Sequence, residues 1–344
     1  MVTLSDVAKA AGVSLSTASR AINGSKDRTV NPQLRERVMA AATELRYAPN
    51  AAAQAIARGR STTLSLIVHD ITDPYFSSVA AGVSRAARAA GSTVMLGIAE
   101  HDLARTISLV ENARSHRTQG LVIVGGLRAD PELLSALQSA INDYRRSSGA
   151  GVAIVGQSVL DVAAVAPANR EGAAALAKAL VAKGFRTYAI LTGPSNHLTG
   201  RDRAEGFTEG LDDSGEIVAR IEGDFTRDGG YAAMTELLAG DVRPDVVFAV
   251  NDVMAVGALA AAREAGVAVP GDVRVAGFDD IPTLRDIVPS LTTVRVPLER
   301  IGEFAVSLAL GEDSPDDGEP QAYQGTQEYE GTQEFEVVLR DSTA

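Results

Sequence analysis

The stretch "TLSDVAKAAGVSLSTASRAIN", Thr3 to Asn23, has the pattern of two short helices joined by a tight turn. Gly12 is expected to end the first helix, and Ser14 to cap the second. A third helix is expected from Pro32 to Leu45, with the proline at a helix start, where its missing N–H costs no hydrogen bond. In all three segments apolar residues recur three or four positions apart, beginning with Leu4, Val7, Ala8 and Ala11 and continuing with Ala18, Ala21 and Ile22.

Three short helices with a glycine in the first turn make a helix-turn-helix unit, whose second helix enters the DNA major groove. Arg20 on that helix can donate two hydrogen bonds to guanine, Leu15 can contact a thymine methyl group, and Ser16 can bond to either class of base edge. Short polar side chains suited to phosphate oxygens are Thr3, Ser5, Ser14, Thr17, Ser19 and Asn23. A small helical subdomain with a polar face is the alternative that this pattern leaves open.

The charge is distributed unevenly along the chain. Residues 1 to 60 carry nine Lys and Arg against four Asp and Glu, a net charge of +5. The whole chain of 344 residues carries -12, so the remaining 284 residues carry -17. A basic head on an acidic body is typical of a protein in which only the head contacts phosphate.

The composition argues against several classes of protein. The chain has no cysteine, and its four histidines show no ligand-like spacing, so we expect no metal site and no cofactor. No phosphate-binding glycine loop, nucleophile elbow or metal-binding motif supports an enzyme. The N-terminus lacks an export signal and no stretch has the length of a membrane span, which predicts a cytoplasmic protein.

A short helix is expected after the third one, within "RYAPNAAAQAIARGRSTT". Asn50 is a good N-cap, residues 51–57 are strong helix formers and Ile56 is the only bulky apolar residue among them. So short a helix is marginal alone in water, but it can order in a DNA minor groove beside a partner copy. Asn50, Ala53 and Ile56 are therefore predicted DNA contacts, with Ile56 wedged between base steps; an ordinary interdomain linker is the alternative.

From residue 63 onward, apolar strands alternate with amphipathic helices. Strands are expected at 63–69, 92–99, 120–126 and 151–157, and in a second series at 187–193, 216–223, 245–250 and 273–279. Helices are expected near 76–90, 102–116, 131–146, 170–183, 201–212, 228–239 and 252–265. The predicted fold is α/β, with two doubly wound units in tandem that bind ligands at the carboxyl ends of their strands.

The head motif, the segment "ERVMAAATELRYAPNAAAQAIARGRS" and the following "LIVHDITDPYF" together resemble the lactose-repressor (LacI/GalR) family of bacterial transcription regulators. The similarity continues along nearly the whole chain. It implies a helix-turn-helix head, a hinge helix and a two-subdomain body like that of periplasmic binding proteins. It also implies a repressor that binds a palindromic operator as a homodimer and is controlled by a sugar, sugar phosphate or nucleoside. In that family the residue matching Ile56 is usually Leu.

The resemblance also gives the expected domain organisation. The DNA-binding domain is expected at 1–49, the hinge at 50–60 and the effector-binding and dimerisation domain at 61–344. Within the last, the N-subdomain is expected at about 61–158 plus 293–320, and the C-subdomain at about 159–292 plus 321–344. The helix near 298–310 would return to the first subdomain and the strand "EFEVVLR" to the second.

The positions that match the family's effector site lie at the ends of predicted strands. They are Asp73, Tyr75, Phe76, Arg203, Phe225, Asn251 and Asp279. Asp252 is interpreted as the cap of the following helix, and His69 as the end of a core strand without a special contact. Ala168 and Phe185 stand where the family usually has Asp and His, so no preference for a particular sugar is transferred.

The C-terminal segment is acidic and repetitive. Residues 311–336 contain nine acids and no base, and the segment "GTQEYE" is followed by "GTQEFE", which predicts a surface loop before the last strand. The chain lacks the leucine heptads that make some relatives tetrameric, which favours a dimer. Two other functions remain as alternatives, a non-catalytic solute receptor and an enzyme on the same scaffold.

Overall fold

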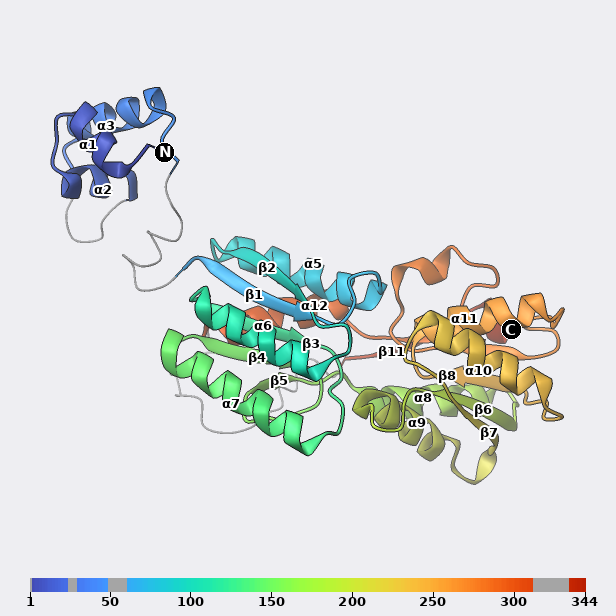
Figure 1. Ribbon diagram of the computed structural model, residues 1–344. Helices are drawn as coiled ribbons and strands as arrows, with labels where there is room; N and C mark the ends of the chain where they lie inside the picture. Colours follow the sequence, from blue (N-terminus) through green and yellow to red (C-terminus); the bar gives the residue numbers. More distant parts are fainter. Residues whose placement is uncertain (1, 24–29, 49–60, 312–333) are drawn as a thin grey trace. The chain divides into compact units, whose positions relative to one another are not determined.

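The computed structural model describes residues 2–23, 30–48, 61–311 and 334–344. The chain forms two compact units, Met1–Ser61 and Thr62–Ala344, which we call the head and the body (Figure 1). The predicted DNA contacts Asn50, Ala53 and Ile56 lie outside the described residues, as does most of the acidic segment near the C-terminus. No helix among the described residues is long and apolar enough to cross a membrane.

The head contains the three predicted helices, α1 (Leu4–Ala10), α2 (Leu15–Asn23) and α3 (Pro32–Glu44). Thr3 and Asp6 form a capping box at the start of α1, and Gly12 ends that helix with a φ of 61°. The Arg37 guanidinium donates to the Ala11 carbonyl at 2.6 Å, which ties α3 to the turn between α1 and α2. The core is small and consists mainly of Val7, Ala8, Ala11, Ala18, Ala21, Val38 and Ala41.

The first half of the body is a parallel sheet in the order β2-β1-β3-β4-β5. Its strands are β1 (Thr63–Val68), β2 (Thr93–Ile98), β3 (Gly120–Val124), β4 (Gly151–Val155) and β5 (Ala163–Val165). Its helices are α5 (Pro74–Ala89), α6 (Leu103–Ser115), α7 (Pro131–Ser148) and α12 (Leu298–Leu310). Neighbouring residues of β1 face opposite sides of the sheet: Leu66 packs with α5 and α12, and Ile67 packs with α6 and α7.

The second half is a parallel sheet in the order β7-β6-β8-β9, with α8 and α9 on one face and α10 and α11 on the other (Figure 1). Its strands are β6 (Thr187–Thr192), β7 (Glu216–Glu222), β8 (Val246–Ala249) and β9 (Arg274–Ala276). Its helices are α8 (Asn169–Ala182), α9 (Leu198–Leu211), α10 (Arg227–Ala239) and α11 (Asp252–Glu264). Two short antiparallel strands complete it, β10 (Thr293–Arg295) and β11 (Glu336–Val338), together with 3-10 turns at Asp212–Ser214, Pro282–Arg285 and Asp341–Thr343.

The chain crosses between the halves more than once, as expected. After β10, α12 returns to the first half, where it packs on α5, β3 and β4, and β11 then pairs with β10. Two expected subdomain boundaries are wrong. Strand β5 pairs with β4, so the first half extends to Val165, beyond the expected limit near 158. Strand β10 pairs with β11 and Arg295 bridges to Asp279, so residues 293–295 belong to the second half.

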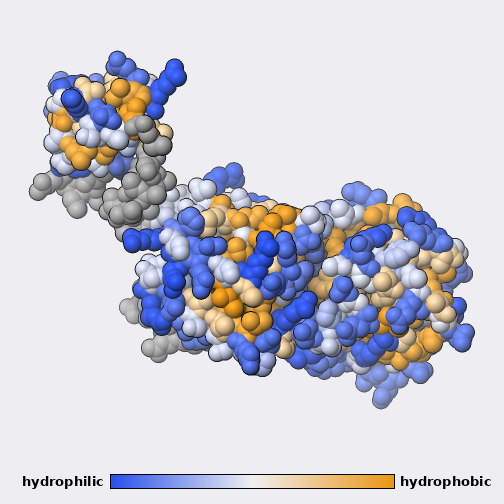
Figure 2. All heavy atoms as spheres, in the orientation of Figure 1, coloured by the Kyte–Doolittle hydropathy of each residue, from blue (hydrophilic) through white to orange (hydrophobic). Residues whose placement is uncertain are grey.

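The surface of the body is mostly hydrophilic but keeps hydrophobic areas (Figure 2). Large apolar side chains that remain exposed there include Leu96, Val242 and Val288, of which Val288 is 97% exposed. Single exposed apolar residues are ordinary, whereas contiguous ones mark contact surfaces. Val288 and the apolar residues around it therefore form a candidate contact surface.

Candidate functional site

A small cavity lies where the carboxyl ends of the two sheets approach each other. All seven residues predicted to contact an effector line it, together with three histidines, a glycine pair and a threonine. The lining residues are His69, Asp73, Tyr75, Phe76, His101, Gly125, Gly126, His197, Thr199, Arg203, Phe225, Asn251 and Asp279. The free volume is about 30 Å³, comparable with the share of one water molecule in the liquid. The cleft is therefore nearly closed in this structure.

Arg203, on α9, is the central cation of the cleft and is only 2% exposed. Its Nη1 and Nη2 donate to the two carboxylate oxygens of Asp279 at 3.2 and 2.7 Å. Nε donates to Asn169 Oδ1 at 2.8 Å and Nη1 also donates to the Val250 carbonyl at 2.9 Å. The guanidinium also lies 4.0 Å from the centre of the Phe278 ring. The charge of Arg203 is therefore neutralised inside the protein before any ligand arrives.

Two of the predicted effector residues also cap helices. Asp73 Oδ1 accepts from the Tyr75 N–H at 2.8 Å at the start of α5, and Asn251 Oδ1 accepts from the Met254 N–H at 2.9 Å at the start of α11. Burial raises the pKa of Asp73 to about 6, against the opposing hydrogen bond from Tyr75. The second carboxylate oxygen of Asp73 and the amide nitrogen of Asn251 thus remain available to a ligand in the cavity.

The interpretation of Asp252 as a helix cap is wrong, because Asn251 holds that position. Asp252 is fully buried, and its carboxylate accepts from the Thr293 hydroxyl at 2.7 Å and from the Ile281 N–H at 3.0 Å. It fixes the segment after β9 and the strand β10 to the start of α11. Burial and the neighbouring Asp279 raise the pKa of Asp252.

The interpretation of His69 is also wrong, because this residue follows β1 into the cavity. Its ring stacks on that of His101 with 4.7 Å between centroids and meets the edge of Phe76 at 5.7 Å. Neither ring nitrogen of His69 has a hydrogen-bond partner among the described residues. Burial lowers the pKa of His69 to about 4, and His101 adds to this.

His197 reaches the same cavity from the second half. Its Nδ1 accepts from the Gly200 N–H at 3.3 Å and so caps α9, and its ring stacks on Phe225 with 4.2 Å between centroids. Burial lowers the pKa of His197 to about 3 and also lowers that of His101. These histidines were not predicted, because the family resemblance places no effector contact at their positions.

The glycine pair Gly125–Gly126 allows close packing in the cleft: Gly125 lies against His69 of its own half, and Gly126 lies against the second half. A Cβ on Gly125 would lie 2.3 Å from Cδ2 of His69, and one on Gly126 would lie 2.4 Å from the Thr199 hydroxyl. Two backbone hydrogen bonds join the halves beside it, from the Leu198 N–H to the Leu127 carbonyl at 3.3 Å and from the Ala129 N–H to the Asn196 carbonyl at 2.9 Å.

Ala168 occupies the N-cap position of α8 and makes no side-chain capping bond there, in agreement with the expected loss of a carboxylate. The neighbouring Asn169 instead binds Arg203. Phe185 does not line the cavity; its ring lies 5.3 Å from the Arg274 guanidinium.

In the head, the predicted contact side chains are exposed or half-buried, and Leu15 is 53% exposed. Arg20 Nε donates to the Ser16 carbonyl at 3.0 Å. The side chain must therefore break this hydrogen bond and extend away from α2 to reach a base. Ser14 accepts from the Thr17 N–H at 3.1 Å and thereby caps α2, as predicted. Thr3, Ser5, Ser19 and Asn23 also lie on the surface or partly on it.

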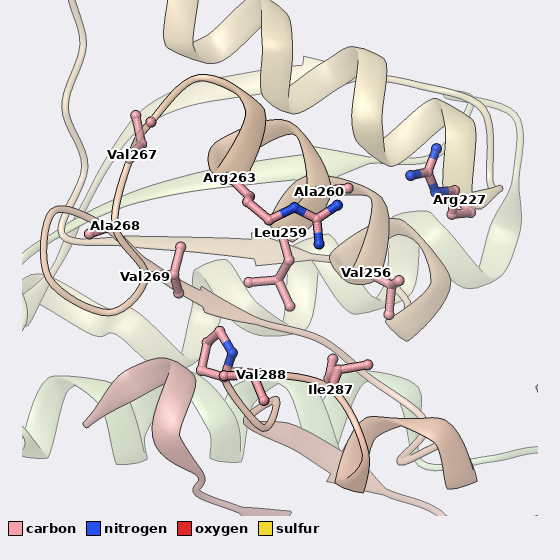
Figure 3. Close-up of a pocket in the computed structure, with 12 residues that line it drawn as sticks. Arg227, Val256, Leu259, Ala260, Arg263, Val267, Ala268, Val269, Ile287 and Val288 are labelled. Carbon is pink, nitrogen blue, oxygen red and sulfur yellow. The ribbon is translucent and has the colours of Figure 1, made fainter.

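A wider hollow of about 630 Å³ lies on the second half, away from the cleft (Figure 3). Its walls come from α11 and from the loops that follow α11 and the Pro282–Arg285 turn. Val256 and Leu259 face it from the helix, Val267 and Val269 from the first loop, and Val288 from the second. Two arginines, Arg227 and Arg263, lie at its edge in the same view.

A helix-turn-helix head joined to two doubly wound halves that enclose a polar cleft defines a ligand-responsive regulator of transcription. Comparisons with known proteins agree. Residues 3–50 match the family model of bacterial regulatory proteins, lacI family, and residues 177–343 match the periplasmic binding protein-like domain. The chain is 34% identical over 319 residues to the HTH-type transcriptional repressor PurR of Erwinia tasmaniensis, covering 90% of each protein. It is 32% identical over 318 residues to the ribose operon repressor of Escherichia coli K12, covering 90% of this chain and 92% of that protein.

Solved structures give the same result. The lac repressor dimer bound to operator and the anti-inducer ONPF is similar with a TM-score of 0.82, at 26% identity and 99% coverage of both chains. The complex of the regulator CelR with cellobiose is similar with a TM-score of 0.64, at 27% identity and coverage of 99% of this chain and 100% of that one. The chain belongs to the lacI family of bacterial regulatory proteins. It is a ligand-responsive, DNA-binding repressor and not an enzyme.

Proposed function

We propose that this repressor binds a palindromic operator as a homodimer in the cytoplasm and is controlled by a small polar effector bound in the cleft between the halves of its body. The single observation that carries the proposal is the convergence of Asp73, Tyr75, Phe76, Arg203, Phe225, Asn251 and Asp279 on one cavity. Carboxylates, an amide and an aromatic face suit the hydroxyls and ring faces of a sugar or a nucleoside. Among similar proteins, one is named a ribose operon repressor and another is described in complex with cellobiose.

The closed cleft suggests how the effector acts. About 30 Å³ is too little for a sugar, so the effector binds a conformation in which the halves stand further apart. Strand β1 begins at Thr63, directly after the hinge segment in the sequence, so movement of the first half changes the constraint on the hinge. Effector and operator then affect each other's affinity by the same factor.

The head would supply the operator contacts. Arg20, Leu15 and Ser16 of α2 would read base edges, and Thr3, Ser5, Ser14, Thr17, Ser19 and Asn23 would bind phosphates. Asn50, Ala53 and Ile56 would contact the minor groove at the centre of the operator. Replacement of Arg20 by alanine should weaken specific binding by about 1–3 kcal/mol and leave non-specific binding largely unchanged.

The hollow on the second half supports the dimer. Its apolar walls and the almost fully exposed Val288 form a surface of the kind that a protein partner covers (Figure 3). A second copy of the chain is the partner that fits, since the similar lac repressor structure is that of a dimer. A symmetric pair of heads also matches a palindromic operator.

The experiment that tests the proposal combines ligand and operator binding. Purified full-length protein is screened by thermal shift against sugars, sugar phosphates and nucleosides, since a ligand of the native state raises the melting temperature. Each hit is then added to a fluorescence anisotropy titration with operator DNA. A hit that raises the melting temperature saturably and changes operator affinity supports the proposal.

Two variants separate the two sites. Arg20→Ala should lose specific operator binding and keep the ligand shift, whereas Phe225→Ala should lose the ligand shift and keep operator binding. Phe225 is preferred to Arg203 because the buried Arg203–Asp279 pair also holds the fold together. A ligand shift unchanged in Phe225→Ala would contradict the assignment of this cleft.

A further inference from the structure

One corner of the cleft is basic. A second hollow, of about 10 Å³, shares residues with the first and is lined by His69, His101, Leu103, Gly126, Leu127, Arg128 and His197. Among these lining residues are three imidazoles and a guanidinium, and none is a carboxylate. We call His69, His101, His197 and Arg128 the basic corner. The effector positions taken from the family resemblance contain none of these four residues.

The basic corner contains an unpaired polar side chain. His69 is 5% exposed, yet neither Nδ1 nor Nε2 makes a hydrogen bond of normal geometry to a described residue. The Gly126 backbone approaches the ring and raises its pKa, against the larger effect of burial. Leaving a buried polar group without a good partner is unfavourable, and such groups in native proteins call for a specific explanation. A ligand atom placed at this corner would supply the missing partner.

The other two histidines can also offer ring nitrogens to a ligand at this corner. His197 accepts a hydrogen bond at Nδ1, so in its neutral form the proton lies on Nε2, which approaches the glycine pair at Gly126. His101 stacks on His69 and is only half-buried, so it connects the corner to solvent. His69 and His101 from the first half and His197 from the second thus line the same hollow.

The electrostatic field at this corner is positive. Burial is the main cause of the lowered pKa of all three histidines, and the charge of Arg128 lowers each pKa further. No ion pair of Arg128 is present among the described residues. The opposing acidic groups are Asp70 and Asp224, which raise the pKa of His101. Arg203, by contrast, is already neutralised by Asp279, so it is not the group that would receive an anion.

We propose that the basic corner binds an anionic group of the effector, a phosphate or a carboxylate, while the hydroxyls of the same molecule reach Asp73, Asn251 and Asp279. This inference rests on the proposed effector cleft and narrows its ligand class to a phosphorylated or acidic sugar. A metal ion fits less well, because no group of three or more His, Cys, Asp or Glu among the described residues has the geometry to hold one. The stacked rings of His69 and His101, inclined by 21°, do not converge on a common point.

Anion binding at this corner must be linked to protons. An anion stabilises the imidazolium form and raises the pKa of the histidines that contact it. The protein then takes up protons as the anion binds, so affinity increases as the pH falls. The charged groups that act on the imidazoles and set the midpoint are Arg128, Arg203, Asp70 and Asp224, together with the neighbouring histidines themselves.

The first test uses sulfate as the probe, because its charge is constant across the relevant pH range. Full-length protein is titrated with sulfate by calorimetry at pH 6 and pH 8, with chloride balancing the ionic strength. Saturable binding that tightens about 3- to 10-fold for each unit of pH decrease is expected, corresponding to uptake of up to one proton. The absence of saturable sulfate binding at pH 6 would overturn the proposal.

Matched variants locate the site. His101→Gln and Arg128→Gln should each weaken sulfate binding about 10-fold and remove most of its pH dependence, and their side chains are exposed enough for folding to survive. His116→Gln is the control, since His116 is the one histidine outside both hollows and is exposed. Sulfate binding that is the same in wild type and in His101→Gln would show an adventitious ion only and would contradict the assignment.

The second test identifies the source of the anion and separates the two proposals. Glucose, glucose 6-phosphate and glucuronate, and likewise ribose and ribose 5-phosphate, are compared by thermal shift. The phosphorylated or acidic member should bind about 10-fold or more tightly than the neutral one, and His101→Gln should remove that difference while His116→Gln keeps it. If neutral sugars bind as tightly as their phosphorylated or acidic counterparts, both in wild type and in His101→Gln, the proposal of an anionic ligand is wrong. The proposal of an effector cleft would not be affected by that result. A ligand shift that persists in Phe225→Ala would instead count against the cleft.

Discussion

At the scale of single residues, some side chains of the cleft both line the cavity and hold the fold together. Arg203 and Asp279 do both, because they line the cavity and form a buried ion pair with each other. Breaking a buried ion pair by removing one partner leaves an uncompensated charge in the interior. The stability of the second half should therefore depend strongly on Arg203.

The first prediction is that Arg203→Met lowers the free energy of unfolding by about 3–5 kcal/mol. Urea unfolding followed by far-ultraviolet circular dichroism measures the change. Arg201→Met on the same helix is the matched control, because its side chain is 52% exposed and its ion pairs are long, at 3.8 and 3.9 Å. The control should change stability by less than about 0.5 kcal/mol. Equal losses in the two variants would argue that the Arg203–Asp279 pair has no special role.

The second prediction concerns Asp73, whose pKa is raised to about 6 by burial. The folded state binds this proton more tightly than the unfolded state, so the stabilising contribution is complete below about pH 4 and is lost as the pH rises through 6. Asparagine keeps the capping bond to Tyr75 and stays neutral at every pH. Asp73→Asn should therefore be more stable than wild type at pH 8, by up to about 3 kcal/mol, and nearly equal to it at pH 4.

Urea unfolding at the two pH values measures this difference. Asp102→Asn provides the control, since Asp102 caps α6 in the same way but is exposed. It should change stability little at either pH. If Asp73→Asn showed no advantage at pH 8, the carboxylate of Asp73 would be well solvated or paired in solution.

At the scale of helices and strands, much of the fold follows from sequence periodicity. Each of the long apolar runs became a strand and each amphipathic segment a helix, with ends shifted by a few residues where a cap decides them. For example, α9 begins at Leu198 and not near 201, because His197 caps it. Strands β5 and β10 were missed because three residues of mostly small or polar type carry no strand pattern that distinguishes them from loop.

Part of the site could also be predicted from the order of the strands. Ligand groups gather at the carboxyl ends of parallel strands, and the seven predicted residues satisfy that rule. His69, His101 and His197 also follow β1, β2 and β6, so the signal for them was present in the sequence. What the sequence does not contain is which of these ends meet across the two halves. That depends on Gly126, where a Cβ would lie 2.4 Å from the Thr199 hydroxyl and 2.8 Å from Cε1 of His197 in the other half.

The third prediction concerns the packing of α12 on α5. A Cβ on Gly302 would lie 2.2 Å from the Val79 carbonyl oxygen, and one on Gly82 would lie 1.9 Å from that of Glu299. Gly302→Ala should therefore force the helices apart and lower the free energy of unfolding by about 1–3 kcal/mol. Gly240→Ala is the control, because its Cβ would meet only the Leu237 oxygen at 3.5 Å. Thermal unfolding of the two variants side by side distinguishes close packing from a general effect of alanine; a tolerated Gly302→Ala would mean that α12 can shift at little cost.

At the scale of the whole molecule, the uneven charge determines which part of the repressor is attracted to DNA, and the proposed dimer determines how many heads bind one operator. The first 60 residues carry +5 and the rest -17, so attraction to DNA is confined to the head and the body repels the phosphates. A single head with few base contacts would bind weakly, and the proposed dimer places two heads on one operator. The affinity for the operator should then depend on the surface that joins the bodies.

The last prediction is that Val288→Glu weakens both dimerisation and operator binding. Val288 is 97% exposed at the edge of the 630 Å³ hollow, and burial of a carboxylate there against a second copy should cost about 2 kcal/mol or more. Sedimentation velocity over a range of concentrations should show a monomer where wild type is a dimer, and operator affinity should fall in parallel. Val242→Glu is the control, because Val242 is also exposed, at 38%, but does not line the hollow. If Val288→Glu remained dimeric, the second copy would have to bind another face, and the hollow would be free for a different partner.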